Sequence, residues 1–267
     1  MLFSALLVLP VLLALLALPI KAAYEQAYND YLFQFDSYRQ KYSDFQVAKN
    51  EYQKFKTLTA QATALEKTKA MMTQRDQFLR SYLLVLYEKL NDPNSGLVPV
   101  TREQYQKILG NEIAFLETHA QTIASVASLE DAEQVSEELE SHYAVLQTSI
   151  RQILTGLSLG QLAIVAKFYD ALVLDSQNLI AQYGGTFTPQ KQETINRWVL
   201  QIVNKRTFYQ QKVDSIAQQN ALLDASDLND LDTKYNANVR GMSEARQYLI
   251  EGISHLAELR DALKYSN

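Results

Sequence analysis

The apolar positions of residues 24–52 follow a heptad pattern in which the apolar residues are aromatic. They recur at intervals of four and three residues, which places them along one face of an α-helix, and the residues between them are mostly polar. This aromatic seam consists of Tyr24, Tyr28, Tyr31, Phe35, Tyr38, Tyr42, Phe45 and Tyr52. The pattern predicts an amphipathic helix whose seam packs against another helix of the chain, a second copy, or a partner.

Residues 24–91 contain neither glycine nor proline, so one long helix, or two helices joined by a bend, is expected there. After Tyr52 the pattern is interrupted, because Phe55 and Leu58 each follow after only three residues. Consecutive three-residue steps overwind a coiled coil locally or mark a bend. We therefore predict a long heptad-patterned helix over residues 24–91 with a bend near residues 57–59.

Residues 101–267 also carry apolar residues at helical spacing and are expected to form a helical bundle. Residues rich in Gly, Pro, Asn and Asp divide the chain into helices. The expected breaks are residues 92–99, 184–185 and 224–232, and the expected helix N-caps are Thr101, Ser128 and Thr188. No segment alternates with period two. The predicted fold is all-α, an elongated helical bundle or coiled coil of about five helices without a sheet.

The first 23 residues form an apolar N-terminal segment that carries no charge between residue 2 and residue 20. Two interpretations stay open. Pro19 followed by Ala22 and Ala23 suits a cleaved signal peptide, although a basic start is lacking. A retained anchor is the other interpretation, since a helix over residues 2–20 nearly matches the ~30 Å hydrocarbon core. We predict a signal peptide or membrane anchor over residues 1–23. Either places the rest of the chain outside the cytoplasm, secreted, periplasmic or anchored to the outer face of the cytoplasmic membrane.

Composition narrows the protein class. The chain has 0 Cys, which excludes disulfides and Cys-based catalysis, and it has no Asn-x-Ser/Thr acceptor. For an exported chain, both absences favour a bacterial cell envelope over a eukaryotic secretory route. The formal net charge of −5 suggests no nucleic-acid surface. We expect no second apolar span after the N-terminal segment and no C-terminal anchor.

The candidate chemical sites are weak. His142 and His255 each follow a glutamate by four residues, but the Glu-x-x-His pattern of a di-iron bundle needs Glu where Leu139 and Gly252 stand. The glutamate–histidine pairs are therefore interpreted as ordinary helix-surface pairs. The acidic residues 224–232 fit no calcium loop and are interpreted as a capping turn.

Other motifs are equally unpromising. The basic residues near Trp198 are dispersed, so this tryptophan is expected in the core, and no phosphate loop or nucleophile motif occurs. We predict no catalytic residue, no cofactor and no metal.

These observations favour a non-enzymatic extracytoplasmic coiled-coil scaffold or adaptor of a bacterial cell envelope. It is expected to self-associate, or to bind an envelope protein, through the aromatic seam. The membrane would be contacted through the N-terminal segment if that segment is uncleaved, and nucleic acid is not expected. The alternative is a monomeric helical-bundle binding module for a small ligand or glycan.

Overall fold

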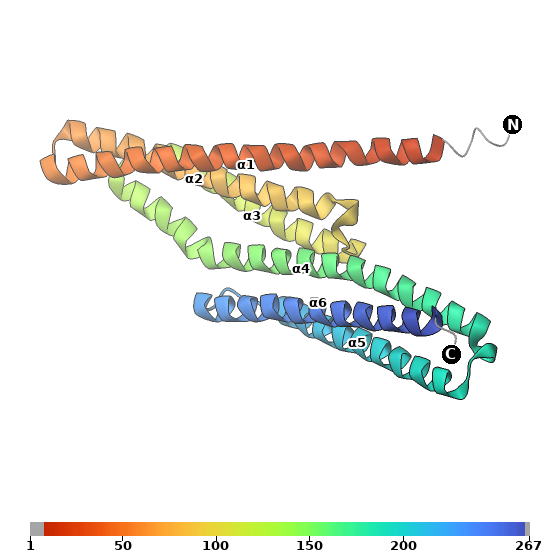
Figure 1. Cartoon of the computed structure of the whole chain (residues 1–267). Coiled ribbons are helices and arrows are strands. Elements are labelled where there is room, and N and C mark those ends of the chain that lie inside the picture. Colours follow the sequence, from red (N-terminus) through yellow and green to blue (C-terminus); the bar gives the residue numbers. More distant parts are fainter. Residues whose placement is uncertain (1–7, 265–267) are drawn as a thin grey trace. The chain divides into compact units, whose positions relative to one another are not determined.

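A computed structural model describes the backbone of residues 8–264 and the side chains of residues 22–264. Figure 1 shows helices throughout, and the described part of the chain contains no strand. The elements are α1 (Val8–Phe55), α2 (Leu58–Asn91), η1 (Pro93–Ser95), α3 (Pro99–Ser125), α4 (Leu129–Tyr183), η2 (Gly184–Thr186), α5 (Pro189–Ala221) and α6 (Leu228–Lys264). The predicted all-α class is confirmed, with six α-helices within residues 8–264 where about five were expected.

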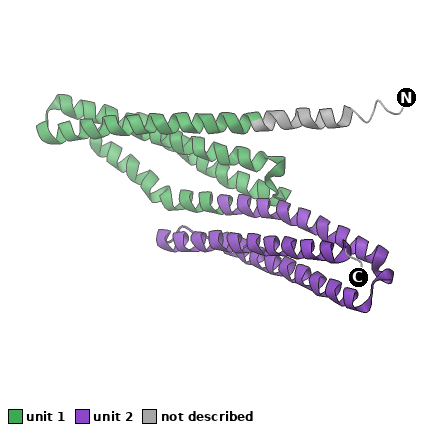
Figure 2. Ribbon diagram, viewed as in Figure 1, with its two compact units in different colours: residues 1–153 green, residues 154–267 purple. Residues whose placement is uncertain are grey.

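The chain divides into two compact units, coloured separately in Figure 2. Unit 1 comprises residues 1–153 and contains α1, α2, η1, α3 and the first part of α4. Unit 2 comprises residues 154–267 and contains the rest of α4 with α5 and α6. The boundary between the two units lies inside α4. The sequence pattern had predicted a single bundle over residues 101–267, which contains this boundary.

The predicted bend near residues 57–59 is a complete reversal of the chain. Lys56 has a positive φ of 49°, and the Thr57 hydroxyl accepts a hydrogen bond from the Ala60 amide (3.2 Å), which caps α2. Helix α2 then runs back along α1, with Tyr82 against Tyr31. The expected long bent helix is therefore two antiparallel helices. The spacing of apolar residues was enough to predict the interruption. The direction of α2 after it depends on which helix surfaces pack together.

The other helix ends agree with the sequence in most places. Ser128 and Asp131 form the predicted capping box, since the Asp131 carboxylate accepts from the Ser128 amide (3.0 Å) and the Ser128 hydroxyl accepts from the Asp131 amide (3.0 Å). Thr188 caps α5 as expected. The predicted cap at Thr101 is wrong, because α3 already begins at Pro99. Proline suits the first helical position, where its missing N–H would have no helical partner.

The predicted signal peptide or anchor falls largely outside the described residues, since residues 1–7 and the side chains of residues 1–21 are not described. The expectation that no second apolar span follows needs a correction. Residues 129–186, which include α4, are long and apolar enough to cross a membrane by length and composition. The most apolar window has a mean hydropathy of 1.5 and is 22% buried. This finding concerns composition only, which a signal sequence or a core helix can share.

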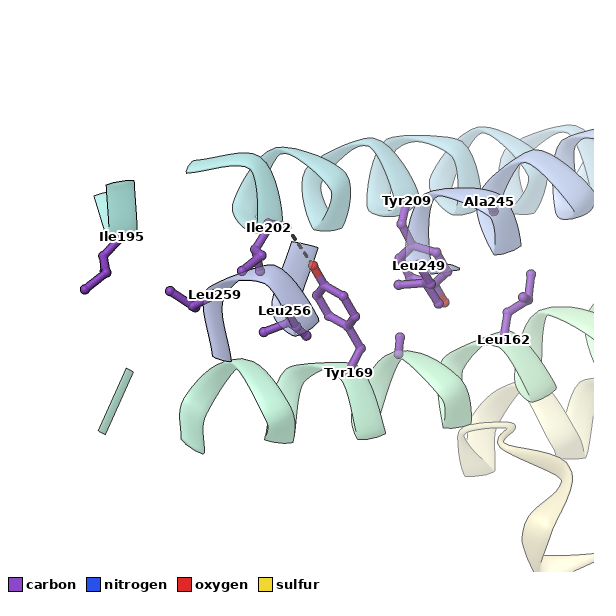
Figure 3. Packing of buried hydrophobic residues seen from close by; sticks show 10 residues of the cluster. Leu162, Tyr169, Ile195, Ile202, Tyr209, Ala245, Leu249, Leu256 and Leu259 are labelled. Atoms are coloured by element: carbon purple, nitrogen blue, oxygen red, sulfur yellow. Dashed lines mark hydrogen bonds between the residues drawn. The ribbon is translucent and has the colours of Figure 1, made fainter. Parts of the chain in front are cut away.

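Unit 2 is organised around Tyr169, a buried residue of α4 (Figure 3). Its hydroxyl donates a hydrogen bond to the Ile202 carbonyl oxygen of α5 (2.8 Å). Burial raises the pKa of Tyr169 to about 12, so the hydroxyl keeps its proton at neutral pH. On α6, Gly252 faces the same ring, and its missing side chain lets α6 approach. Trp198, expected in the core, is partly buried at the edge of this cluster and stacks on His255.

Candidate functional site

The middle of the aromatic seam packs on α2 of the same chain. The Phe78 ring of α2 lies 5.6 Å from the Tyr31 ring, 5.4 Å from Phe35 and 5.7 Å from Tyr38, measured between centroids. The Tyr38 and Phe78 rings are nearly parallel, with an interplanar angle of 5°. At the N-terminal end of the seam, the Lys89 ammonium lies over the Tyr24 ring. Part of the seam therefore holds α1 and α2 together.

Other parts of the seam are more accessible. Tyr28 and Tyr42 are exposed, and Phe35 stays partly accessible beside its contact with Phe78. Leu32, which is next to the seam, is exposed as well. Tyr28 and Tyr42 have ring neighbours within α1. This outer edge of the seam is the part of α1 on which a partner could pack without displacing α2.

The C-terminal part of the seam opens into a groove of about 420 Å³ within unit 1. Phe45 and Tyr52 of α1 line it together with Met71 and Met72 of α2. The first two turns of α4 complete the lining, with Ala132 among its residues. We call this the unit 1 groove. Its walls are mainly apolar, and Met side chains can adapt to ligands of different shape.

Charged and polar side chains also line the groove. Lys49 and Gln53 of α1 and Glu133 and Ser136 of α4 are among these residues. One helical turn beyond Met71, the Arg75 guanidinium lies 3.4 Å from the Ser136 hydroxyl through Nη1. The groove therefore combines an apolar interior with side chains of both charge signs, which could orient a bound segment.

Tyr38 lies near this end of the seam, and its pKa is raised. Burial is the main cause, and the positive charge of Arg75 offsets part of the effect. The phenol is therefore neutral at physiological pH and acts as a packing group with a hydroxyl that can form hydrogen bonds.

A buried ion pair joins α2 and α3, and its histidine also contacts α4. His119 of α3 and Asp76 of α2 are both nearly inaccessible, and the His119 Nδ1 lies 2.6 Å from an Asp76 carboxylate oxygen. The His119 Nε2 lies 2.7 Å from the Val135 carbonyl oxygen of α4. A carbonyl only accepts, so Nε2 must carry a proton. Arg75 adds a weaker contact, with its Nε 3.6 Å from the other Asp76 oxygen.

The proton balance of this pair favours an imidazolium. Burial alone would lower the pKa of His119, but the hydrogen bonds to Asp76 and Val135 and the charge of Asp76 outweigh it, so the pKa is raised. A carboxylate and a carbonyl both accept, so the two contacts also fit an imidazolium that donates from each ring nitrogen. Asp76, His119 and Val135 connect α2, α3 and α4.

A second polar contact in unit 1 joins α3 and α4. His142 Nε2 of α4 lies 2.7 Å from the Glu112 carboxylate of α3, and the Ser149 hydroxyl donates to the same carboxylate (2.9 Å). The Phe115 ring stacks on both His142 (3.7 Å) and His119 (5.9 Å). The expected surface pairing of His142 within its own helix is thus replaced by a contact between helices, because the half-buried imidazole points toward α3.

The sequence did contain a signal for these residues. Between Tyr105 and Ile123, Glu112 and His119 stand at the two heptad core positions that are not apolar. Asp76 occupies the equivalent position between Met72 and Leu79 of α2. Charged residues at core positions of neighbouring helices indicate buried pairing, but only the fold shows which ones meet.

The buried side chains Asp76, Glu112 and His119 each contact a neighbouring helix of unit 1. Among the described residues no group of three or more His, Asp and Glu side chains is arranged to hold a metal. Residues 224–232 form the predicted capping turn, in which the Asp227 carboxylate accepts from the Asn229 amide (2.8 Å). The unit 1 groove is therefore the feature best suited to binding.

Comparisons with protein-family models, with curated proteins and with solved structures found no significant match. The class is therefore defined by the structure itself. It is an all-α protein of two helical units, with an aromatic helix pair and an apolar groove in unit 1.

The packing role of the seam can be measured at Tyr38. Tyr38→Ala removes the ring that stacks on Phe78, so the free energy of unfolding should fall by about 1–2 kcal/mol. Tyr42→Ala is the matched control, because Tyr42 is exposed and lies one heptad step further along the same helix. Urea unfolding followed by circular dichroism compares the two. Equal losses for both variants would contradict a packing role specific to the α2-facing side.

Proposed function

We propose that this chain is a non-enzymatic extracytoplasmic scaffold or adaptor of a bacterial cell envelope. In this proposal unit 1 binds a segment of a partner protein through the unit 1 groove and the adjoining exposed edge of the aromatic seam. The observation that carries the proposal is the groove itself, which is formed by three helices and lined by Phe45, Tyr52, Met71 and Met72.

The chemistry of the groove supports a protein partner. Aromatic and Met side chains are enriched at protein interfaces, because they supply large adaptable contact areas. An amphipathic helix commonly binds by placing its apolar face in such a groove. Lys49 and Glu133 would then orient the partner through charged residues of its own.

The other polar groups support a structural role in preference to catalysis. Asp76 and His119 contact each other and the α4 backbone, while Glu112 contacts His142 and Ser149. Neither contact includes a residue that lines the groove. The extracytoplasmic location rests on the apolar N-terminal segment, which would be a signal peptide or an anchor.

Site-specific photo-crosslinking in intact bacterial cells tests the proposal. A photoreactive residue replaces Gln53, which lines the groove, or Gln40, which is exposed on another face of α1. We expect a discrete protein adduct from position 53 and none from position 40. The adduct at position 53 should be lost when Thr68→Trp fills the groove wall in a variant whose melting temperature is unchanged.

Two results would contradict the proposal. One is the absence of any adduct at position 53, and the other is the same adduct at both positions. The volume of about 420 Å³ also lies within the range of small-molecule sites, which keeps a ligand-binding module as the second candidate. Native mass spectrometry of the isolated chain would then detect a bound small molecule that is absent from the Thr68→Trp variant.

A further inference from the structure

Helix α4 exposes a second heptad seam in unit 2. Its members alternate at intervals of three and four residues along residues 158–182, and all of them are exposed. They are Ser158, Gln161, Val165, Phe168, Leu172, Asp175, Leu179 and Gln182. We call this set the α4 seam. The neighbouring face of the same helix, about 100° around its axis, buries Leu162, Ala166 and Tyr169 in the core of unit 2.

The centre of the α4 seam is unusually apolar for an exposed surface. Phe168 is 69% exposed, Leu172 49%, Leu179 48% and Val165 42%. Val165, Phe168 and Leu172 occupy three consecutive seam positions, and Leu179 follows after Asp175. Large exposed apolar side chains grouped in this way mark an interaction surface more often than a chance arrangement. The whole α4 seam extends roughly 36 Å at about 1.5 Å per residue, long enough for a helix-to-helix interface.

We propose that the α4 seam binds the α4 seam of a second copy of this chain, with the two helices antiparallel and a two-fold axis near Phe168. In this arrangement Val165 of each copy packs near Leu172 of the other, and the two Phe168 rings meet close to the axis. An interface of this kind is self-complementary, because the same patch serves both copies. The proposal does not depend on the unit 1 groove.

The polar members of the seam favour this occupant and this orientation. Gln161 lies four residues before Val165, and Asp175 lies three residues after Leu172, so they flank the apolar centre almost symmetrically. An antiparallel pair places the Gln161 amide of one copy near the Asp175 carboxylate of the other, where it can donate a hydrogen bond. A parallel pair would place the two Asp175 carboxylates against each other, which is unfavourable.

Asp175 also makes a lipid bilayer a poorer occupant. An aspartate at the centre of a membrane helix costs about 2.5–3.5 kcal/mol on insertion scales. In the antiparallel pair of helices, by contrast, Asp175 lies beside the Gln161 amide of the second copy. A polar position within an apolar seam is also a known way to specify register and orientation.

The mass of the full chain in solution tests the proposal. The chain is kept in solution with a mild detergent, and light scattering on a sizing column is corrected for the micelle. We expect two copies of the 30.4 kDa chain per particle. Phe168→Glu with Leu172→Glu should give single copies, since loss of one central contact alone raises the dissociation constant by about 30-fold.

Leu174→Glu is the matched control for this experiment. Leu174 lies on the same helix and is 57% exposed, but it stands outside the α4 seam. The control should remain a dimer with the melting temperature of the wild type. The double variant should keep the helical content of the wild type by circular dichroism, since none of the substituted residues is buried, but it should lose the stabilisation that association gives the dimer. A dimer that survives Phe168→Glu with Leu172→Glu would overturn the proposal even if the unit 1 groove is confirmed as a binding site.

Two further outcomes also decide against the proposal. One is a monomeric wild-type chain. The other is a monomeric chain whose binding to phosphatidylglycerol vesicles is lost in Phe168→Glu with Leu172→Glu, which would assign the seam to a lipid surface.

Orientation is measured with a spin label at Ser158→Cys, the single cysteine of such a chain. An antiparallel pair predicts a label separation of about 30 Å and a parallel pair about 10 Å. The shorter distance would contradict the antiparallel arrangement.

Discussion

Replacing His119 with leucine is expected to lower the free energy of unfolding by about 3–5 kcal/mol at neutral pH. The substitution removes the imidazolium and leaves the Asp76 carboxylate buried, with Arg75 as its nearest charge at 3.6 Å. It also leaves the Val135 carbonyl oxygen without the imidazole donor. Urea unfolding of the full chain, followed by circular dichroism, measures the loss.

A double variant separates the burial of an unpaired charge from the loss of packing. His119→Leu combined with Asp76→Leu should be more stable than His119→Leu alone, since the carboxylate that has lost its imidazole partner is then removed from the core. Arg80→Leu is the control, because Arg80 and Glu117 form an exposed pair between the same two helices (2.8 Å) and should contribute at most about 1 kcal/mol. A His119→Leu loss no larger than that of Arg80→Leu would contradict the buried pair.

The pair also predicts a pH dependence. The pKa of His119 is raised above its ordinary value of 6.5, so the folded chain binds the proton more tightly than the unfolded chain. The resulting stabilisation is fully present below pH 6.5 and is lost as the pH rises through the folded pKa. The stability of wild type relative to His119→Leu should therefore decrease over that interval. A difference that grows with pH would show that the imidazole is neutral in the folded chain.

Gly252→Ala is expected to destabilise unit 2 by about 2–3 kcal/mol, although alanine normally favours a helix interior. A methyl group at this position would lie 2.6 Å from Cε2 and 2.8 Å from Cζ of Tyr169, and would also meet its hydroxyl. The ring is buried and its hydroxyl is bonded to Ile202, so it cannot move without breaking that hydrogen bond and disturbing the core. The expected loss is a net value: the steric clash costs more than this, and the roughly 1 kcal/mol by which alanine is favoured over glycine in a helix has been subtracted.

Gly110→Ala is expected to have the opposite effect, an increase in the free energy of unfolding. Gly110 also lies inside a helix, but no atom outside its own helix backbone lies within 4 Å of the added methyl group. This variant should gain about 0.5–1 kcal/mol. When Tyr169→Leu accompanies Gly252→Ala, the glycine substitution should cost less, because the smaller side chain leaves room. Equal effects at Gly110 and Gly252 would contradict the close approach of α6 to Tyr169.

The sequence by itself determined the local features of this protein. Spacing of the apolar residues was sufficient for the all-helical class, and the caps at Ser128 and Thr188 followed from residues within one turn of each helix start. The interruption after Tyr52 was also readable, since it breaks the heptad pattern. These features depend on neighbours within a few positions of the chain, so a linear pattern is enough to predict them.

Only the tertiary structure decided which surfaces meet. Phe78 faces the aromatic seam because the chain reverses at Lys56, and His119 pairs with Asp76 because α3 packs on α2. Two seams with the same heptad spacing have different surroundings. The middle of the aromatic seam packs on α2, whereas the α4 seam is exposed. A heptad pattern predicts that one face of a helix is apolar. Which surface covers that face depends on the energy of packing all the helices together.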